Sequence, residues 1–196
     1  MSTFPHHLLS ILLLLIIKLT DAQEYQLQLL PESSILIKGS SNVNKFTFTY
    51  EKTLKPNSSI NVEKNKSTIT LKNARIDAEV VAFSSGSNLM DRDYRKMMNY
   101  RAFPYISIVI HQINFLKSYN ENSGTSEAIA SICIAGEKRL DTLQFNYSKT
   151  KEIYRCSSAH ELSLRDYKIK PLKKMMGLIS LKDLLKVEMI LYLKID

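Results

Sequence analysis

Short runs in which apolar and polar residues alternate recur along most of the chain, and this period of two residues constrains the fold more than any other feature. Residues 46–50 read Phe-Thr-Phe-Thr-Tyr, and residues 187–194 read Val-Glu-Met-Ile-Leu-Tyr-Leu-Lys. Successive side chains of a β-strand point to opposite faces, so each such run has one apolar face and one wetter face. The pattern predicts antiparallel strands arranged around a single interior.

Clusters of Ser, Asn, Gly and Lys separate these runs, as expected of turns. The predicted strands cover residues 34–38, 44–50, 67–71, 75–82, 105–115, 127–135, 140–148, 152–164 and 185–195. Their number and spacing indicate an all-β closed barrel or a sandwich, and closure would remove exposed strand edges. Neither an internal repeat nor a low-complexity linker interrupts the pattern, so one domain is expected over residues 23–196.

One segment, SNLMDRDYRKMMNYRAFPYISIVI, breaks the strand pattern. Met90, Tyr94 and Met97 step by four and three residues, which places them on one face of a helix. Pro104 pushes the residue before it toward extended geometry, so the helix must end before the next strand begins. We predict a short amphipathic helix over about residues 89–98 that closes one end of the barrel. A catalytic constellation in the same segment is the less favoured alternative.

A second unusual block, LRDYKIKPLKKMMGLISLKDLL, precedes the last predicted strand. Pro171 and Gly177 punctuate it, which predicts a long loop or a single turn of helix. Methionine is flexible and adapts to varied apolar shapes, so Met175 and Met176 fit either core packing or a lid over a lipid-sized cavity.

The N-terminus has the features of an export signal. Residues 8–17 contain ten residues of which only Ser10 is polar, a run too short for a membrane span of about 20 apolar residues. Such a run suits a signal peptide, and Ala22 offers a small residue for cleavage before Gln23. The sequence therefore predicts a signal peptide over residues 1–22 and a periplasmic or secreted mature protein.

The formal net charge of +8 comes from basic residues that are scattered along the chain. Removal of residues 1–22 leaves it unchanged, because Lys18 and Asp21 are lost together. Scattered charge is typical of solvated faces, and the alternative is transient contact with an anionic membrane surface or lipid headgroup. No nucleic-acid recognition motif accompanies the charge, so nucleic acid is not an expected partner.

Cys133 and Cys156 belong to strand-like runs that are separated by a third run. In a simple meander they lie two strands apart, at roughly twice the 4.8 Å strand spacing. A disulfide needs Cα atoms within about 7 Å, so two separate core residues are favoured over a bond.

Motifs for catalysis and metal binding are lacking. The sequence has no Gly-x-Ser-x-Gly, and Leu164 stands where a zinc helix beginning at His160 needs its second histidine. The mature chain keeps two histidines and two separated cysteines, which make a poor metal set. We therefore expect neither an enzyme nor a cofactor nor a metal site.

Four segments in order carry a family resemblance: GSSNVNKFTF, SSGSNLMDRDYRKMM, FPYISI and LRDYKIKPLKKMMGLISLKD. Together they resemble the YceI-like family, most of all the branch common in Bacteroidetes-type bacteria. The resemblance covers nearly the whole mature chain. It implies a lipocalin-like antiparallel barrel, exported to the periplasm, whose apolar tunnel binds polyisoprenoid lipids. The broader family often has a histidine and a Phe-Phe pair after its Arg-Asp, whereas Tyr-Arg-Lys-Met-Met follows Arg92-Asp93 in this sequence.

The leading hypothesis is an exported protein that holds a long apolar lipid, of polyisoprenoid or quinone type, in the barrel. Residues predicted to line the interior are Phe46, Phe48, Tyr50, Met90, Met97, Ile106, Ile108, Met175, Met176, Val187, Met189 and Leu191. Basic candidates for contact with a headgroup are Arg92, Arg95, Lys170 and Lys173. The alternative is a structural or interaction module whose barrel is filled by its own side chains. Cavity volume discriminates the two.

Overall fold

The computed structural model describes residues 23–56, 59–65, 67–120, 122–174 and 177–195. The strands in chain order are β1 (Gln23–Leu29), β2 (Ser34–Ser40), β3 (Lys45–Tyr50), β4 (Lys55–Pro56), β5 (Ser59–Lys64), β6 (Thr68–Glu79), β7 (Phe83–Ser84), β8 (Tyr105–Asn120), β9 (Ser123–Ile134), β10 (Glu137–Thr150), β11 (Ile153–Ser163), β12 (Lys173–Lys174), β13 (Ile179–Ser180) and β14 (Leu184–Ile195). The helical elements are the 3-10 turns η2 (Val80–Ala82) and η3 (Leu164–Tyr167) and the α-helix α2 (Asn88–Met97).

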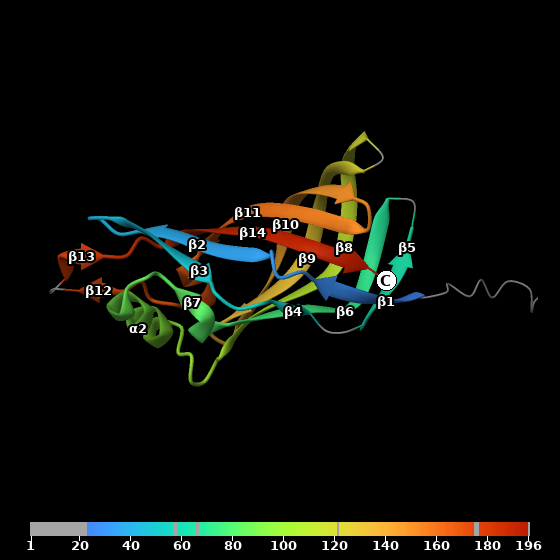
Figure 1. Ribbon diagram of the computed structural model, residues 1–196. Coiled ribbons are helices and arrows are strands. Elements are labelled where there is room, and N and C mark those ends of the chain that lie inside the picture. The colour runs from blue at the N-terminus through green and yellow to red at the C-terminus, as the bar shows by residue number, and fades with distance from the viewer. Residues whose placement is uncertain (1–22, 57–58, 66, 121, 175–176, 196) are drawn as a thin grey trace, which may run out of the picture.

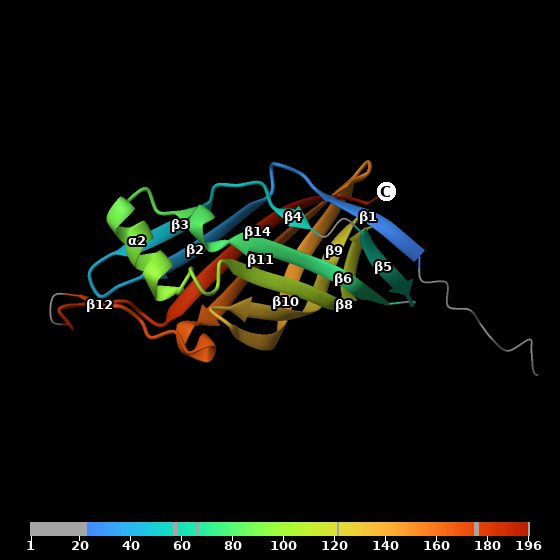
Figure 2. The ribbon, with the colours of Figure 1, turned by 90° about the horizontal axis from the view of Figure 1, so that it is seen from below.

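Twelve of these strands form one antiparallel sheet that curls into a half-barrel (Figures 1 and 2). Its order is β1-β5-β6-β8-β9-β10-β11-β14-β2-β3-β7, and β4 lies beside β6. Helix α2 and the small β12–β13 sheet lie at one end of the molecule, and β1 lies at the other (Figure 1). The all-β prediction is confirmed, whereas a fully closed barrel stays a prediction.

The predicted strands are present, and two of them merge. Residues 67–71 and most of 75–82 belong to the single strand β6, whose register against β8 shifts between Thr70 and Ala74. Asn73 lies within that shift with a φ of 65°, a left-handed conformation that asparagine tolerates better than most residues. Strands β1 and β5 were not predicted.

Helix α2 confirms the predicted helix and begins one residue earlier than expected. Its N-cap residue, Ser87, makes no side-chain cap hydrogen bond, so another contact holds the start of the helix. The buried carboxylate of Asp91 accepts hydrogen bonds from the backbone N–H of Ser85 at 2.7 Å, from its hydroxyl at 2.6 Å and from the hydroxyl of Ser84 at 3.1 Å. Burial raises the pKa of Asp91, but these hydrogen bonds outweigh it and hold the pKa below its usual range. The first turn of α2 is thereby fastened to β7.

The long segment before β14 folds back over the same end of the sheet. The carboxylate of Asp183 accepts hydrogen bonds from the Ser163 hydroxyl at 2.6 Å and from the Arg165 backbone N–H at 3.0 Å. Farther along, the Asn42 side chain in the β2–β3 turn donates to the Leu178 carbonyl at 2.8 Å and accepts from the Ser180 backbone N–H at 2.9 Å. These contacts hold the segment against β2 and β3.

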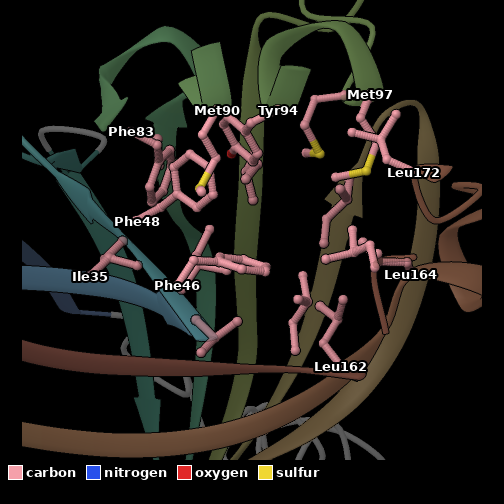
Figure 3. A pocket seen from close by; sticks show the side chains of 18 of the residues that line it. Ile35, Phe46, Phe48, Phe83, Met90, Tyr94, Met97, Leu162, Leu164 and Leu172 are labelled. Atoms are coloured by element: carbon pink, nitrogen blue, oxygen red, sulfur yellow. The ribbon is translucent and has the colours of Figure 1, made fainter. Parts of the chain in front are cut away.

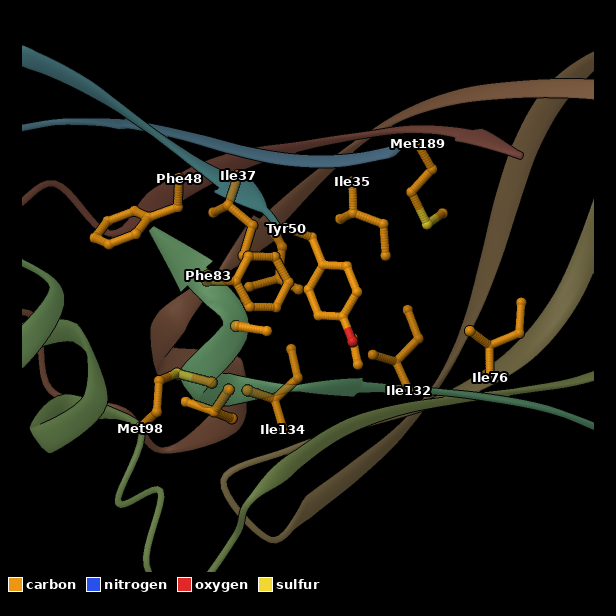
Figure 4. Packing of buried hydrophobic residues seen from close by; sticks show 14 of the residues in the cluster. Ile35, Ile37, Phe48, Tyr50, Ile76, Phe83, Met98, Ile132, Ile134 and Met189 are labelled. Carbon is orange, nitrogen blue, oxygen red and sulfur yellow. The ribbon is translucent and has the colours of Figure 1, made fainter. Parts of the chain in front are cut away.

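A row of aromatic rings forms the core beneath α2 (Figure 4). Phe48 of β3 lies 4.6 Å from Tyr94 of α2, between ring centroids, and Phe83 of β7 lies 5.9 Å from Tyr94 and 5.1 Å from Tyr50. Such tilted and edge-on pairs contribute about 0.5–1.5 kcal/mol beyond the burial of their area. The rings therefore join the helix to two strands.

Both cysteines are free thiols on strands β9 and β11, which are separated by β10. The expectation of two separate residues is confirmed, although each is half-buried rather than fully enclosed. Burial raises the pKa of Cys156 to about 11, so its thiol stays protonated at neutral pH.

We expect Phe83→Ala to lower the free energy of unfolding by about 3–5 kcal/mol, because the ring is only 1% exposed and its loss leaves a cavity among the other rings. Its neighbour Val81 is 38% exposed, so Val81→Ala should cost less than about 0.5 kcal/mol. Urea unfolding followed by far-UV circular dichroism measures both. Equal losses in the two variants would contradict this account of the core.

Candidate functional site

An apolar cavity of about 310 Å³ lies between the concave face of the sheet and α2 (Figure 3). Met90, Tyr94 and Met97 approach it from α2, as their helical spacing predicts. Phe46 and Phe48 approach it from β3. The wall is almost entirely hydrocarbon and thioether, which suits an apolar chain and offers little to a polar substrate.

Eight of the residues predicted to line the interior contribute to this wall. They are Phe46, Phe48, Met90, Met97, Ile106, Ile108, Val187 and Met189. Tyr50 and Leu191 are not among the lining residues: Tyr50 packs on Phe83, and Leu191 packs against the core elsewhere on β14. Met175 and Met176 lie outside the described residues.

Several lining residues were missed by the sequence analysis, although the signal was present. They include Ile35 and Ile37 on β2, Ile132 and Ile134 on β9, and Leu162 on β11. Each pair on one strand is two residues apart, so the alternation that selected Phe46 and Phe48 would also have selected them.

Along the inner face of β9, the buried residues change from large to small with distance from α2. Beyond Ile132 this face carries the buried small residues Ala130, Ala128 and Ser126, followed by Gly124. A Cβ atom at Gly124 would lie 2.2 Å from the carbonyl oxygen of Lys117 on the adjacent strand β8, so the two strands approach too closely there for a side chain. None of these four small residues lines the cavity, whose wall lies nearer α2.

Tyr94 brings a hydroxyl group into the aromatic part of the wall. Its hydroxyl is buried and has no hydrogen-bond partner among the described residues. Phe48 and Phe83 flank the ring, and burial raises the pKa of Tyr94 above its usual range. The hydroxyl therefore remains protonated and costs stability.

A second, more polar hollow of about 510 Å³ adjoins the cavity, and we call it the lysine cleft. Its basic residues are Lys96, Lys168, Lys170 and Lys173, and its acidic residues are Asp93 and Glu137. Asp93, Met97 and Leu172 line both the cavity and the cleft, so the two hollows share a wall. Lys168 is held 2.9 Å from Glu137, whereas the described structure gives Lys170 and Lys173 no salt bridge.

The four headgroup candidates separate into two pairs. Lys170 and Lys173 line the lysine cleft. Arg92 is exposed on α2 and lines neither hollow, and the Arg95 guanidinium donates to the Val81 carbonyl at 3.1 Å. Lys96 and Lys168 also line the cleft without having been predicted, because α2 and the segment after η3 come to one hollow only in the folded chain.

In the part of the chain that the structure describes, no group of three or more His, Cys, Asp and Glu side chains gathers in a way that could hold a metal ion. Helix α2 has ten residues, and no helix in that part of the chain is long and apolar enough to cross a membrane.

No family model matches the sequence, and no curated protein matches it. Solved structures do match. BcnA of Burkholderia cenocepacia superimposes with a TM-score of 0.63 at 9% identity, over 82% of this chain and 96% of that one. A polyisoprenoid-binding domain from Saccharophagus degradans, implicated in plant cell wall breakdown, has a TM-score of 0.60 at 10% identity, over 87% and 97%.

A mutant of the Campylobacter jejuni YceI protein matches with a TM-score of 0.50 at 9% identity, over 78% of this chain and 82% of that one. The chain has the YceI fold. At this identity the likeness extends to the fold alone, so the YceI-like resemblance is confirmed at that level. The Bacteroidetes-type branch stays a prediction.

We expect Tyr94→Phe to raise the free energy of unfolding of the ligand-free protein by about 1 kcal/mol, because it removes a buried hydroxyl that lacks a partner. Tyr50→Phe is the matched control, since the Tyr50 hydroxyl accepts a hydrogen bond from the Glu79 backbone N–H at 3.4 Å. Thermal unfolding should show a gain for the first variant and no gain for the second. A clear loss in Tyr94→Phe would mean that the hydroxyl has a partner.

Proposed function

We propose that this protein is an exported, non-catalytic binding protein that holds the apolar chain of a lipid in the cavity. The observation that carries the proposal is a 310 Å³ volume with an almost wholly apolar wall. Burial of each methylene group contributes about 0.8 kcal/mol, so a chain of about ten carbons has ample driving force even after the cost of association.

A long lipid of polyisoprenoid or quinone type is the proposed ligand. The fold shared with a polyisoprenoid-binding domain supports this class. Ligand pockets usually enclose about 300–1,000 Å³, and this cavity is at the lower end of that range. We therefore expect only part of a long chain to lie inside unless the flexible side chains of Met90 and Met97 move aside.

A closed barrel around that chain is part of the proposal. Strand β1 pairs with β5 through residues 23–26 and with β14 through residues 27–29, so it contacts both sides of the curled sheet. These pairings support closure at the end far from α2. Closure there would leave the α2 end as the route for ligand entry.

The lysine cleft is the proposed location of a headgroup. Lys170 and Lys173 adjoin the apolar cavity, so an anionic group can meet them while its chain stays dry. Arg92 and Arg95 are weaker candidates, given their positions outside both hollows. The same lysines would favour transient contact with an anionic membrane surface.

Export through a signal peptide over residues 1–22 completes the proposal, and it rests on the apolar run at residues 8–17. The alternative, a structural barrel filled by its own side chains, is less favoured because the interior near α2 is not filled.

Two changes to the wall test lipid binding. Phe46→Asp places a charge in the wall, and Ala78→Leu fills part of the volume without adding charge. Both should weaken uptake of the fluorescent apolar probe N-phenyl-1-naphthylamine at least about tenfold. Phe46→Asp places an unpaired charge beside an apolar ligand, which is strongly unfavourable, and Ala78→Leu removes volume that the probe would occupy.

Leu140→Asp is the matched control, because Leu140 is exposed on the outer side of β10. Circular dichroism establishes that each variant is folded. Unchanged probe uptake in folded Phe46→Asp and Ala78→Leu would show that the cavity is not the binding site.

A further inference from the structure

Five residues that line the cavity carry polar groups: Ser41, Asn44, Asp93, Tyr94 and His160. The first four are occupied, exposed or enclosed. The Ser41 hydroxyl donates to the Asn44 side-chain oxygen at 2.8 Å within the β2–β3 turn, and Asn44 is exposed there. Asp93 also lines the lysine cleft and has a partner, and the Tyr94 hydroxyl is enclosed by its neighbours. His160 differs from them because it is half-buried in the wall and the described structure gives its Nδ1 no partner.

The carboxylate of Asp141 holds the imidazole of His160 through one of its two nitrogens. Its Nε2 lies 2.9 Å from a carboxylate oxygen of Asp141 on the adjacent strand β10, and the His160 side chain is 20% exposed. The other Asp141 oxygen accepts a hydrogen bond from the Thr142 backbone N–H at 2.8 Å, which orients the carboxylate. Asp141 is the only hydrogen-bond partner that the described structure gives the ring.

This geometry fixes what the ring can bind. A carboxylate at Nε2 selects the tautomer that carries its proton there, which leaves Nδ1 as an acceptor. The neutral ring then accepts a hydrogen bond from a hydroxyl, and the protonated ring donates one to an oxygen. In either state its natural ligand partner is an oxygen, and a pure hydrocarbon supplies none.

His160 lies where a bound lipid would determine whether its ring has a hydrogen-bond partner. It lies on β11 two residues from Leu162 and opposite Val187 of β14, and both of these neighbours line the cavity. A lipid that fills this volume displaces water from the ring, so without an oxygen of its own it leaves Nδ1 unpaired in an apolar surrounding.

We propose that the cavity selects a lipid with an alcohol-type oxygen, which is hydrogen-bonded inside the wall by His160 while Asp141 positions the ring. This inference rests on the proposed function, because it assumes that a lipid occupies the cavity. It adds a ligand class, lipids with a hydroxyl group, and a recognition point separate from the lysine cleft.

The test uses two probes with the same C15 chain, farnesol with a hydroxyl group and farnesene without one. Each competes with N-phenyl-1-naphthylamine for the mature protein, and the ratio of the two affinities is compared between variants so that the different hydration of the probes cancels. His160→Leu should shift the ratio toward farnesene by about three- to tenfold, the effect of one lost hydrogen bond.

Two further variants control for effects of the substitution on folding and on the strand itself. The double variant His160→Leu/Asp141→Asn removes both partners, so no carboxylate is left without its histidine if the single change impairs folding. Glu161→Gln alters an exposed residue of the same strand that does not line the cavity, and it should leave the ratio unchanged.

An unchanged ratio in folded His160→Leu and in the double variant would overturn this inference while leaving lipid binding intact. Failure of the wild-type protein to bind either farnesol or farnesene would instead count against the proposed function.

Discussion

The contacts of Tyr94 with Phe48 and Phe83 are the interaction on which the functional end of this protein depends. A curled sheet of alternating residues has an apolar concave face that must be covered, and at this end α2 provides the cover. The three rings join α2 to β3 and β7, with centroids 4.6 and 5.9 Å from that of Tyr94. Asp91 adds a polar fastening at the start of the helix. Because α2 is held at both its first turn and its middle, it covers the sheet without collapsing onto it, and the cavity persists beneath it.

The gradient of side-chain size along the sheet divides the interior into two parts. At the far end, β9 carries the buried small residues Ala130, Ala128 and Ser126, and none of them lines the cavity. Near α2, large branched and aromatic residues stand apart and enclose the open volume. The lysine cleft adjoins this volume at the surface, and His160 supplies one oriented polar group within it. An apolar chain, an oxygen along it and an anionic end would each find a suitable surface here.

Much of the fold could be predicted from local sequence. Alternation over residues 46–50 and the four-and-three spacing within α2 both depend on neighbouring residues, and both elements form as expected. The sheet order could not be predicted, because β2 pairs with β14 about 150 residues away and local pattern carries no information about such pairing. For the same reason, local sequence could not predict the pairing of His160 with Asp141, which come from adjacent strands. Nor could it predict that a lysine of α2 and the lysines after η3 line one cleft. The ends of the cavity depend on how opposite walls pack, which alternation alone does not determine.

Identification of the lipid that co-purifies with the protein is the most direct test of whether the cavity holds a lipid. The protein would be purified without detergent and extracted with organic solvent, and the extract would be analysed by mass spectrometry. The account predicts close to one lipid per chain, with a long apolar chain and at least one oxygen. A folded, freshly purified protein whose extract contains no lipid above that of a protein without a cavity would contradict the account.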